Sequence, residues 1–142
     1  MVVDGTANYA TQGRFASACQ IVVGKPEQVL SQIKIDDLTF FALMTHNYNY
    51  DKALLYLLTK KNIKYIAMLG PRKKLERILS EYQSRGRELS PEEISTIYSP
   101  AGLDIGAETS EEIALSILSE IQAFVSEKSS ASLRHKSIPI HN

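Results

Sequence analysis

The chain has 142 residues, of which 44% are hydrophobic and 23% are charged, close to the averages for globular proteins. This length suits one domain, and the composition excludes collagen-like and disordered classes. Sixteen basic residues balance sixteen acidic ones, so the overall charge gives no reason to expect nucleic acid or an anionic membrane as a partner.

Cysteine usage and the distribution of apolar residues exclude further classes. Cys19 is the single cysteine, which excludes an intrachain disulfide scaffold, and no Cys and His residues stand at metal-ligand spacing. No stretch approaches the roughly 20 apolar residues that a membrane-spanning helix needs, and residues 1–5 do not resemble a signal peptide. We therefore expect a cytoplasmic protein without a membrane span or a metal site. Cys19 has no nearby cationic neighbour in the sequence, so we expect it to be a small buried side chain.

Four short apolar runs, separated by helical segments, indicate the fold class. The runs cover residues 1–3, 21–23, 40–44 and 65–69. Short continuous apolar runs are typical of strands that are buried on both faces of a parallel sheet. The amphipathic segment over 48–60 is long enough to connect two such strands as a crossover helix. The sequence therefore predicts an α/β fold with a parallel sheet and flanking helices.

The second half of the chain carries clear signals for the ends of helices. A helical pattern runs up to Gly86, a natural stop. Ser90 and Thr109 each precede a Glu by three residues, which is the pattern of a capping box at the start of a helix. We expect the last helix to end the domain, which then covers residues 1–128. The polar residues 129–142 are expected to form a flexible tail.

Ligands of an open parallel sheet bind beyond the carboxyl ends of its strands, so the residues that follow each strand are candidates for a site. Asp4 ends the first run, where a dinucleotide-binding fold would hold a ribose diol; a turn aspartate beside Gly5 is the favoured alternative. His46 follows the third run at the start of a helix, where its ring would donate to an anionic ligand. The alternative is that Thr45 or Asn47 caps the helix and that His46 is solvated.

The strongest physical signal is a basic helix start. Arg72 and Lys73 stand in the first turn after Gly70 and Pro71, where cations oppose the helix dipole. A phosphate-bearing ligand, bound by free backbone N–H groups and these two side chains, would compensate. The alternative is an exposed basic turn that Glu76 and solvent neutralise.

A glycine-rich loop follows the short helix that starts after Ser90. Gly102 and Gly106 flank Asp104, and two glycines in so short a segment indicate a loop with a defined path. We expect Leu103 and Ile105 to anchor this loop beneath the final helix.

Three segments together resemble a known family. They are Thr45-His46-Asn47 with Asp51, Gly70-Pro71-Arg72-Lys73-Lys74, and Gly102-Leu103-Asp104-Ile105-Gly106-Ala107. In this order they resemble the C-terminal Rossmann-type domain of the xanthine dehydrogenase accessory (XdhC/CoxI) family, over about residues 2–125. The resemblance implies a Rossmann-like parallel sheet with flanking helices.

The resemblance also implies a function. Members of the family are non-catalytic maturation proteins that bind the molybdenum cofactor, a molybdopterin, and help to equip it with its sulfur ligand through a sulfurtransferase partner. They deliver it to a xanthine dehydrogenase or a related molybdenum hydroxylase. By the same resemblance we expect no catalytic residue, and a cofactor-binding site formed by His46, Arg72, Lys73, Gly102 and Asp104, with Asp4 at its rim.

One departure from the family pattern concerns the sheet. Relatives carry a first strand and a glycine-rich turn before the strand that ends in Asp4, and residues 1–142 begin after that point. In a 3-2-1-4-5 strand order, this first strand lies between the strands at Val2 and Phe40. We therefore expect a gap in the sheet. The chain is then a fragment, half of a split protein, or a subunit that accepts a strand from a partner. As partners we expect a second copy in a homo-oligomer, or the upstream half of a split protein.

Two other functions remain as alternatives. The first is a fragment of an oxidoreductase that binds NAD(P), which Asp4 favours and the lack of a glycine-rich pyrophosphate loop or an evident acid/base pair disfavours. The second is a structural interaction subunit.

Overall fold

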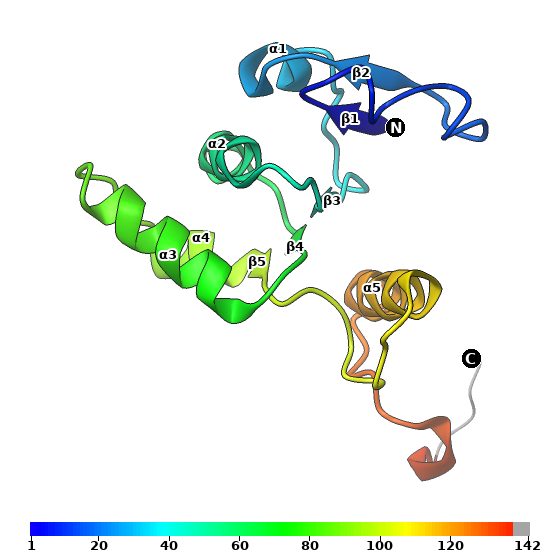
Figure 1. The fold of residues 1–142 in the computed structure, drawn as a ribbon. Coiled ribbons are helices and arrows are strands. Elements are labelled where there is room, and N and C mark those ends of the chain that lie inside the picture. The colour runs from blue at the N-terminus through cyan, green and yellow to red at the C-terminus, as the bar shows by residue number, and fades with distance from the viewer. Residues whose placement is uncertain (138–142) are drawn as a thin grey trace.

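The computed structural model describes residues 1–137 and confirms the α/β fold class (Figure 1). The elements follow in this order: β1 (Val2–Asp4), β2 (Ile21–Val23), α1 (Pro26–Leu30), β3 (Phe41–Leu43), α2 (Tyr48–Leu58), β4 (Ile66–Met68), α3 (Arg72–Gln83), α4 (Pro91–Ser95), β5 (Ile97–Tyr98), α5 (Ser110–Val125) and the 3-10 turn η1 (Leu133–His135). The last part of the expected tail, residues 138–142, lies outside the described residues.

All strand pairs are parallel, and the sheet is interrupted where the sequence predicts a gap. β1 pairs with β2, with Val3 opposite Val22. Separately, β3 pairs with β4 and β4 with β5, with Ala42 opposite Ala67. No strand of the described residues joins β1 to β3, so two parallel sheets stand where a Rossmann-like fold has one.

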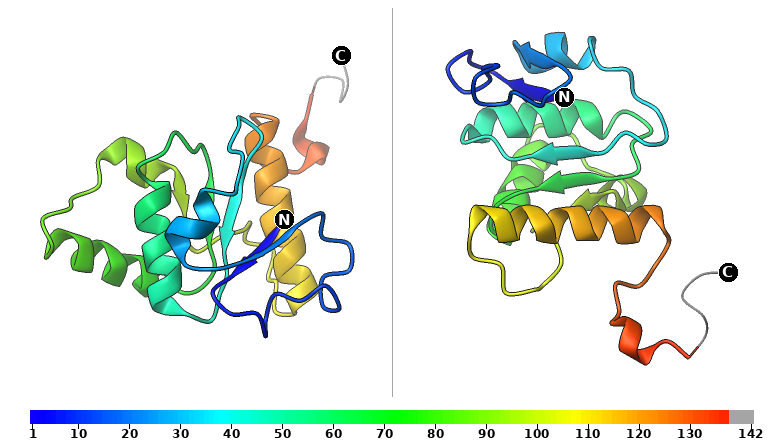
Figure 2. Two further views of the ribbon diagram at one scale, coloured as in Figure 1. Left: turned by 90° about the horizontal axis from the view of Figure 1, so that it is seen from above. Right: turned by 90° about the vertical axis from the view of Figure 1, so that its right-hand side faces the viewer.

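Helices cover both faces of the larger sheet. Figure 1 shows α2 and α3 on one side of the strands and α5 on the other, and the right-hand view of Figure 2 agrees. Leu55 and Leu58 of α2 are fully buried in one core with Met68 of β4. A second, smaller core lies under α5, where Tyr65 packs against Ile117. Among residues 1–137, no helix combines the length and the apolar character that crossing a membrane requires.

The local signals in the sequence place the helix starts correctly. Ser90 accepts a hydrogen bond from the N–H of Glu93, and Glu93 accepts one in return from the N–H of Ser90, which completes the predicted capping box of α4. Thr109 and Glu112 form the same box at the start of α5. Satisfied backbone N–H groups at these positions fix where the helices begin.

Three expectations need correction. β5 is not predicted, because a two-residue strand shows no periodicity. Cys19 is exposed and not buried, because the irregular segment that connects β1 to β2 leaves it on the surface. Ile105 is 51% exposed and does not anchor its loop beneath α5.

Candidate functional site

The carboxyl ends of the strands form one edge of the molecule, where the predicted site residues follow β1, β3, β4 and β5. Two backbone hydrogen bonds hold the loops at this edge together. The N–H of Leu69, after β4, donates to the carbonyl of Leu43 at 2.9 Å. The N–H of Ala101, after β5, donates to the carbonyl of Met68 at 3.2 Å. This is the edge at which parallel α/β sheets bind ligands.

A buried ion pair lies at the centre of this edge. Asp51, in the first turn of α2, is fully buried, and its Oδ1 accepts a hydrogen bond of 2.6 Å from the hydroxyl of Thr45. Its Oδ2 accepts one of 2.8 Å from the ammonium of Lys74, in the first turn of α3. The same ammonium donates to the carbonyl of Leu69 at 3.1 Å. An ammonium group has three N–H donors, so one donor of Lys74 has no partner among residues 1–137.

The start of α3 has the properties of an anion site. Pro71 is the N-cap and provides no side-chain acceptor, and the first turn contains no acidic residue. The N–H of Lys74 donates to the carbonyl of Pro71 at 2.8 Å, but the N–H groups of Arg72 and Lys73 before it have no cap acceptor. No acidic side chain of the first turn compensates the positive end of the helix dipole. Arg72 and Lys73 point to solvent, and the Nε of Arg72 lies 3.5 Å from the carboxylate of Glu76. That contact is the neutralising pair considered above, but it joins two exposed side chains and is weak.

Lys74 is the inward cation that sequence reasoning missed. The helical periodicity of this segment could have shown that Lys74 points inward, because residues four apart share one face of a helix. Ile78 is fully buried four positions after Lys74. Lys74 therefore faces inward with Ile78, whereas Arg72 and Lys73 do not.

His46 is exposed in the loop between β3 and α2. Asn47, its neighbour, caps α2 by accepting a hydrogen bond of 3.1 Å from the N–H of Tyr50. The helix start therefore does not need His46 as a cap, and its imidazole ring is accessible from solvent at the same edge as Lys74.

Asp4 lies at the carboxyl end of β1, and its Oδ1 accepts bonds from the N–H and the hydroxyl of Thr6 at 2.8 and 3.1 Å. This is the turn geometry of an aspartate beside a glycine. Gly5 lies against the ring of Tyr50, which brings the end of β1 close to the start of α2. Burial raises the pKa of Tyr50, and the nearby carboxylate of Asp4 raises it further. Asp4 therefore lies beside the ion pair of Asp51 and Lys74, at the margin of the edge formed by the carboxyl ends of the strands.

Gly102 and Asp104 lie in the loop after β5, and they differ in their surroundings. Gly102 has a φ of +104°, and a Cβ atom there would lie 2.3 Å from the hydroxyl of Ser116 on α5. Its N–H donates to Glu120 at 2.8 Å. Gly102 therefore packs the loop against α5, whereas Asp104 is exposed.

Glu120 links that loop to the core. Its carboxylate also accepts a hydrogen bond of 2.6 Å from the hydroxyl of Tyr65. Burial of the ring, together with the hydrogen bond and the charge of Glu120, raises the pKa of Tyr65 far above its usual range. Tyr65 therefore stays a neutral donor that helps to hold the loop in place.

Comparison with known proteins assigns the family. Residues 1–121 match the family model described as the XdhC Rossmann domain. The chain belongs to this family. It is 36% identical over 121 residues to a protein of Bacillus subtilis (strain 168) that is named as a probable xanthine dehydrogenase subunit; the match covers 85% of this chain and 34% of that protein. It is also 36% identical over 81 residues to the uncharacterized protein YqeB of Escherichia coli (strain K12), covering 57% of this chain and 14% of the relative.

A solved structure supports the same assignment for this XdhC Rossmann domain. The crystal structure of a xanthine dehydrogenase from Bacillus halodurans superposes with a TM-score of 0.74 at 31% identity. The match covers 92% of this chain and 37% of that protein. The chain thus spans about a third of the length of the B. subtilis and B. halodurans relatives.

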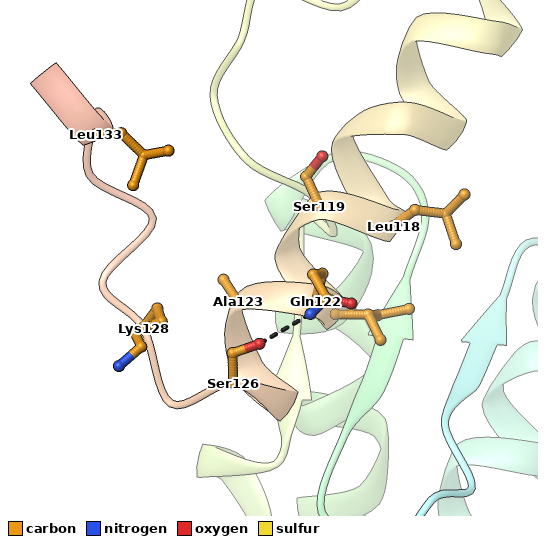
Figure 3. Close-up of a pocket in the computed structure, with 8 residues that line it drawn as sticks. Leu118, Ser119, Gln122, Ala123, Ser126, Lys128 and Leu133 are labelled. Carbon is orange, nitrogen blue, oxygen red and sulfur yellow. Dashed lines mark hydrogen bonds between the residues drawn. The ribbon is translucent and has the colours of Figure 1, made fainter. Parts of the chain in front are cut away.

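One hollow in the described residues lies away from the strand ends. It is an open groove of about 810 Å³ between the second half of α5 and the segment that follows it (Figure 3). Leu118 and Ile121 line it from the helix, and Leu133 lines it from the opposite side. None of the expected site residues contributes to it.

A phosphate-bearing cofactor fits the residues at the start of α3. The fit rests on the uncapped first turn without an acidic residue and on the third donor of Lys74. Within residues 1–137, no three His, Cys, Asp or Glu side chains group as metal ligands. Lys74, Arg72 and Lys73 would therefore hold such a cofactor through its phosphate.

Proposed function

We propose that this XdhC Rossmann domain is the cofactor-binding part of a non-catalytic accessory protein for a xanthine dehydrogenase-type molybdenum hydroxylase. The cofactor is of the molybdopterin type, and its phosphate binds at the start of α3. The observation that carries the proposal is the position of Lys74, whose ammonium is held between Asp51 and the carbonyl of Leu69 beside an uncapped helix start. The names of the relatives from B. subtilis and B. halodurans support the connection with xanthine dehydrogenase.

In this proposal the chain's residues bind and orient the cofactor. The N–H groups of Arg72 and Lys73 and the third donor of the Lys74 ammonium bind the phosphate, while the side chains of Arg72 and Lys73 add charge from the exposed side. Asp51 fixes the direction of Lys74 and keeps its ammonium at the strand ends. His46 and the loop with Gly102 and Asp104 lie at the same edge as further contacts, with Asp4 at the rim.

The wider role in this proposal is suggested by the family resemblance. The bound molybdenum cofactor supplies the redox chemistry of the client enzyme, and the accessory protein protects it during sulfuration and insertion. A sulfurtransferase and the hydroxylase are the expected protein partners. The exposed positions of His46 and Asp104 suit a site that passes its cofactor to a partner.

One observation favours NAD(P) as a second candidate ligand. Asp4 ends β1, where dinucleotide folds hold the ribose, and its Oδ2 has no hydrogen-bond partner among residues 1–137. An interaction subunit without a ligand is the third candidate.

Cofactor binding separates these candidates. Isolated molybdopterin is titrated against the 142-residue chain and against the double variant Arg72→Ala/Lys73→Ala, with NADH in parallel. Each lost charge-assisted bond to phosphate costs roughly 1.5–3 kcal/mol, so the double change should weaken molybdopterin binding by tens of fold or more. Arg85→Ala, an exposed cation after the other end of α3, is the control.

Molybdopterin binding that is equal in the wild type and the double variant contradicts the proposed site. NADH binding that Asp4→Asn abolishes would instead support the dinucleotide candidate. The absence of binding to either compound would favour the interaction subunit.

A further inference from the structure

We propose that a hollow between β5 and the second half of α5 binds a small organic cation, an ammonium group on an apolar stem. The hollow has a volume of about 430 Å³, and sites for small molecules measure roughly 300–1,000 Å³. The loop after β5 and the segment after α5 both line it, and Figure 1 shows these two segments beside α5. The proposal is independent of the cofactor proposed above, because no expected site residue lines this hollow.

Aromatic side chains form an apolar wall of the hollow. Tyr98 of β5 and Phe124 of α5 both line it. The ring of Tyr98 stacks on the fully buried ring of Tyr65, with the centroids 4.1 Å apart, and meets the ring of Phe124 edge to face at 5.9 Å. The wall is therefore fixed before a ligand binds. Aromatic faces carry partial negative charge and attract ammonium groups.

The loop after β5 is also held in place. Leu103 lines the hollow, and its carbonyl accepts a hydrogen bond of 2.6 Å from the hydroxyl of Ser116 on α5. Its N–H donates to the carbonyl of Ser116 at 3.4 Å. The apolar side chain of Leu103 thus has a defined position opposite the helix, as a preformed small-molecule site requires.

Glu120 adds a carboxylate to this apolar lining. Its Oε2 atom accepts hydrogen bonds from the hydroxyl of Tyr65 at 2.6 Å and from the N–H of Gly102 at 2.8 Å. These bonds fix the orientation of the carboxylate, and its Oε1 atom has no hydrogen-bond partner among residues 1–137. Since Glu120 lines the hollow and is half-buried, its free oxygen atom is available to a cation. A partly desolvated carboxylate is stabilised by such a partner.

The charges around the hollow complement a single positive charge. Glu120 and Glu127 contribute two carboxylates to the lining and Lys128 contributes one ammonium, which leaves one negative charge in excess. Neither carboxylate forms an ion pair within residues 1–137. A monovalent cation balances this excess, whereas an anion would meet two like charges.

The backbone at the hollow is strained at two positions. Glu127 and Ser130 have φ values of +52° and +60°, and they are the two residues other than glycine with a positive φ among residues 1–137. Both line the hollow. Glu127 directly follows Ser126, the C-cap of α5, at a position where glycine is the usual residue. The glutamate thus places a carboxylate at the hollow at a cost to the helix end, and strain of this kind is common at ligand sites.

Binding of phenethylamine to the 142-residue chain tests the proposal. Phenethyl alcohol has nearly the same shape without the charge, and phenylacetate carries the opposite charge. We expect phenethylamine to shift the amide resonances of Leu103, Phe124 and Ser130 in an NMR titration. The alcohol should bind about tenfold more weakly, because it lacks the charge-assisted bond and the cation–π attraction, and phenylacetate should not bind.

Substitutions of the two glutamates make the test specific. Glu120→Gln keeps an acceptor for Tyr65 and Gly102 but removes the charge, and should weaken phenethylamine binding by about tenfold. Glu127→Gly should weaken binding by about threefold while the chain melts at a higher temperature, since glycine relieves the strain at a φ of +52°. Glu111→Gln is the control, because Glu111 is an exposed carboxylate at the other end of α5.

Three results would overturn the proposal. The first is equal affinity for phenethylamine and phenethyl alcohol, which would show that the charge is not recognised. The second is unchanged amine binding in both Glu120→Gln and Glu127→Gly. The third is a set of shifted resonances at the start of α3 without any change at Leu103, Phe124 and Ser130, which would place the amine outside the hollow.

Discussion

The ammonium of Lys74 lies 2.8 Å from the Oδ2 atom of Asp51 and joins the first turn of α3 to the first turn of α2. The side chain of Asp51 is fully buried, and that of Lys74 is 16% exposed. A carboxylate in this environment is stable only with partners that replace water. The pair therefore has two roles, because it holds α2 and α3 together and aims the remaining donor of Lys74 at the proposed phosphate site.

The first prediction concerns this ion pair. Lys74→Met leaves the buried carboxylate of Asp51 with the hydroxyl of Thr45 as its one remaining side-chain partner among the described residues. Removing one member of a buried pair destabilises a protein by about 3–5 kcal/mol, which we expect urea unfolding to show.

Lys73→Met is the matched control, because it removes an exposed cation from the same helix turn. It should leave the stability unchanged or raise it slightly, since a cation that opposes the helix dipole is lost. A Lys74→Met variant as stable as the wild type, with the same urea dependence, would show that the ion pair does not hold α2 and α3 together.

Much of the fold follows from the sequence because its signals are local. The apolar run over 65–69 contains the fully buried strand β4, and the capping boxes at Ser90 and Thr109 mark where helices begin. The position of Cys19 depends instead on the path of an irregular segment, which no periodicity specifies. For the same reason, the apolar residues of the Gly102 loop do not indicate that Ile105 is exposed.

The site is only partly predictable for a similar reason. The sequence identifies the basic turn at the start of α3, but a run of three cations does not show which one points inward. Lys74 is selected by the tertiary packing that places Asp51 opposite it. The role of Gly102 also depends on a distant partner, because Ser116 lies fourteen positions later in the chain.

The second prediction separates the two glycines of that loop. Gly102→Ala adds a Cβ atom 2.3 Å from the hydroxyl of Ser116 at a φ of +104°, so both sterics and backbone strain oppose it. We expect a loss of stability larger than the roughly 1–3 kcal/mol of a strained backbone position alone, measured by thermal unfolding.

Gly106→Ala is the control for the steric part. Gly106 has a φ of +69°, but a Cβ atom there meets nothing within 4 Å. It should cost only the backbone strain, about 1 kcal/mol. Equal losses in the two variants would mean that contact with Ser116 does not constrain the loop.

The third prediction concerns Cys19, which is exposed on the segment between β1 and β2. An accessible thiol reacts with an aromatic disulfide reagent without unfolding of the protein. One equivalent should therefore react in the native chain at a rate within about threefold of the rate in urea. Protection of the thiol in the native chain would show that this segment packs over Cys19, and Cys19→Ser, which has no thiol, gives the background.

The fourth prediction concerns the acid dependence of stability. Glu81 of α3 accepts hydrogen bonds from Lys52 at 2.6 Å, from the hydroxyl of Tyr48 at 3.0 Å and from Arg77 at 3.0 Å. These partners, Lys52 first, lower the pKa of Glu81 from 4.5 to about 2. A group whose pKa falls on folding binds its proton more tightly in the unfolded chain, so its charged form stabilises the folded state.

This contribution is complete above pH 4.5 and disappears as the pH falls toward 2, through the folded-state pKa. The melting temperature of the wild type should therefore exceed that of Glu81→Gln at pH 6, and the two curves should converge between about pH 4.5 and 2. Glu76→Gln is the control, because its one ion pair, with Arg72, joins two largely exposed side chains. A difference in melting temperature between wild type and Glu81→Gln that stays constant from pH 6 to 2 would show that Glu81 acts through packing. A contribution from its charge would disappear when the carboxylate is protonated, whereas a contribution from packing would not.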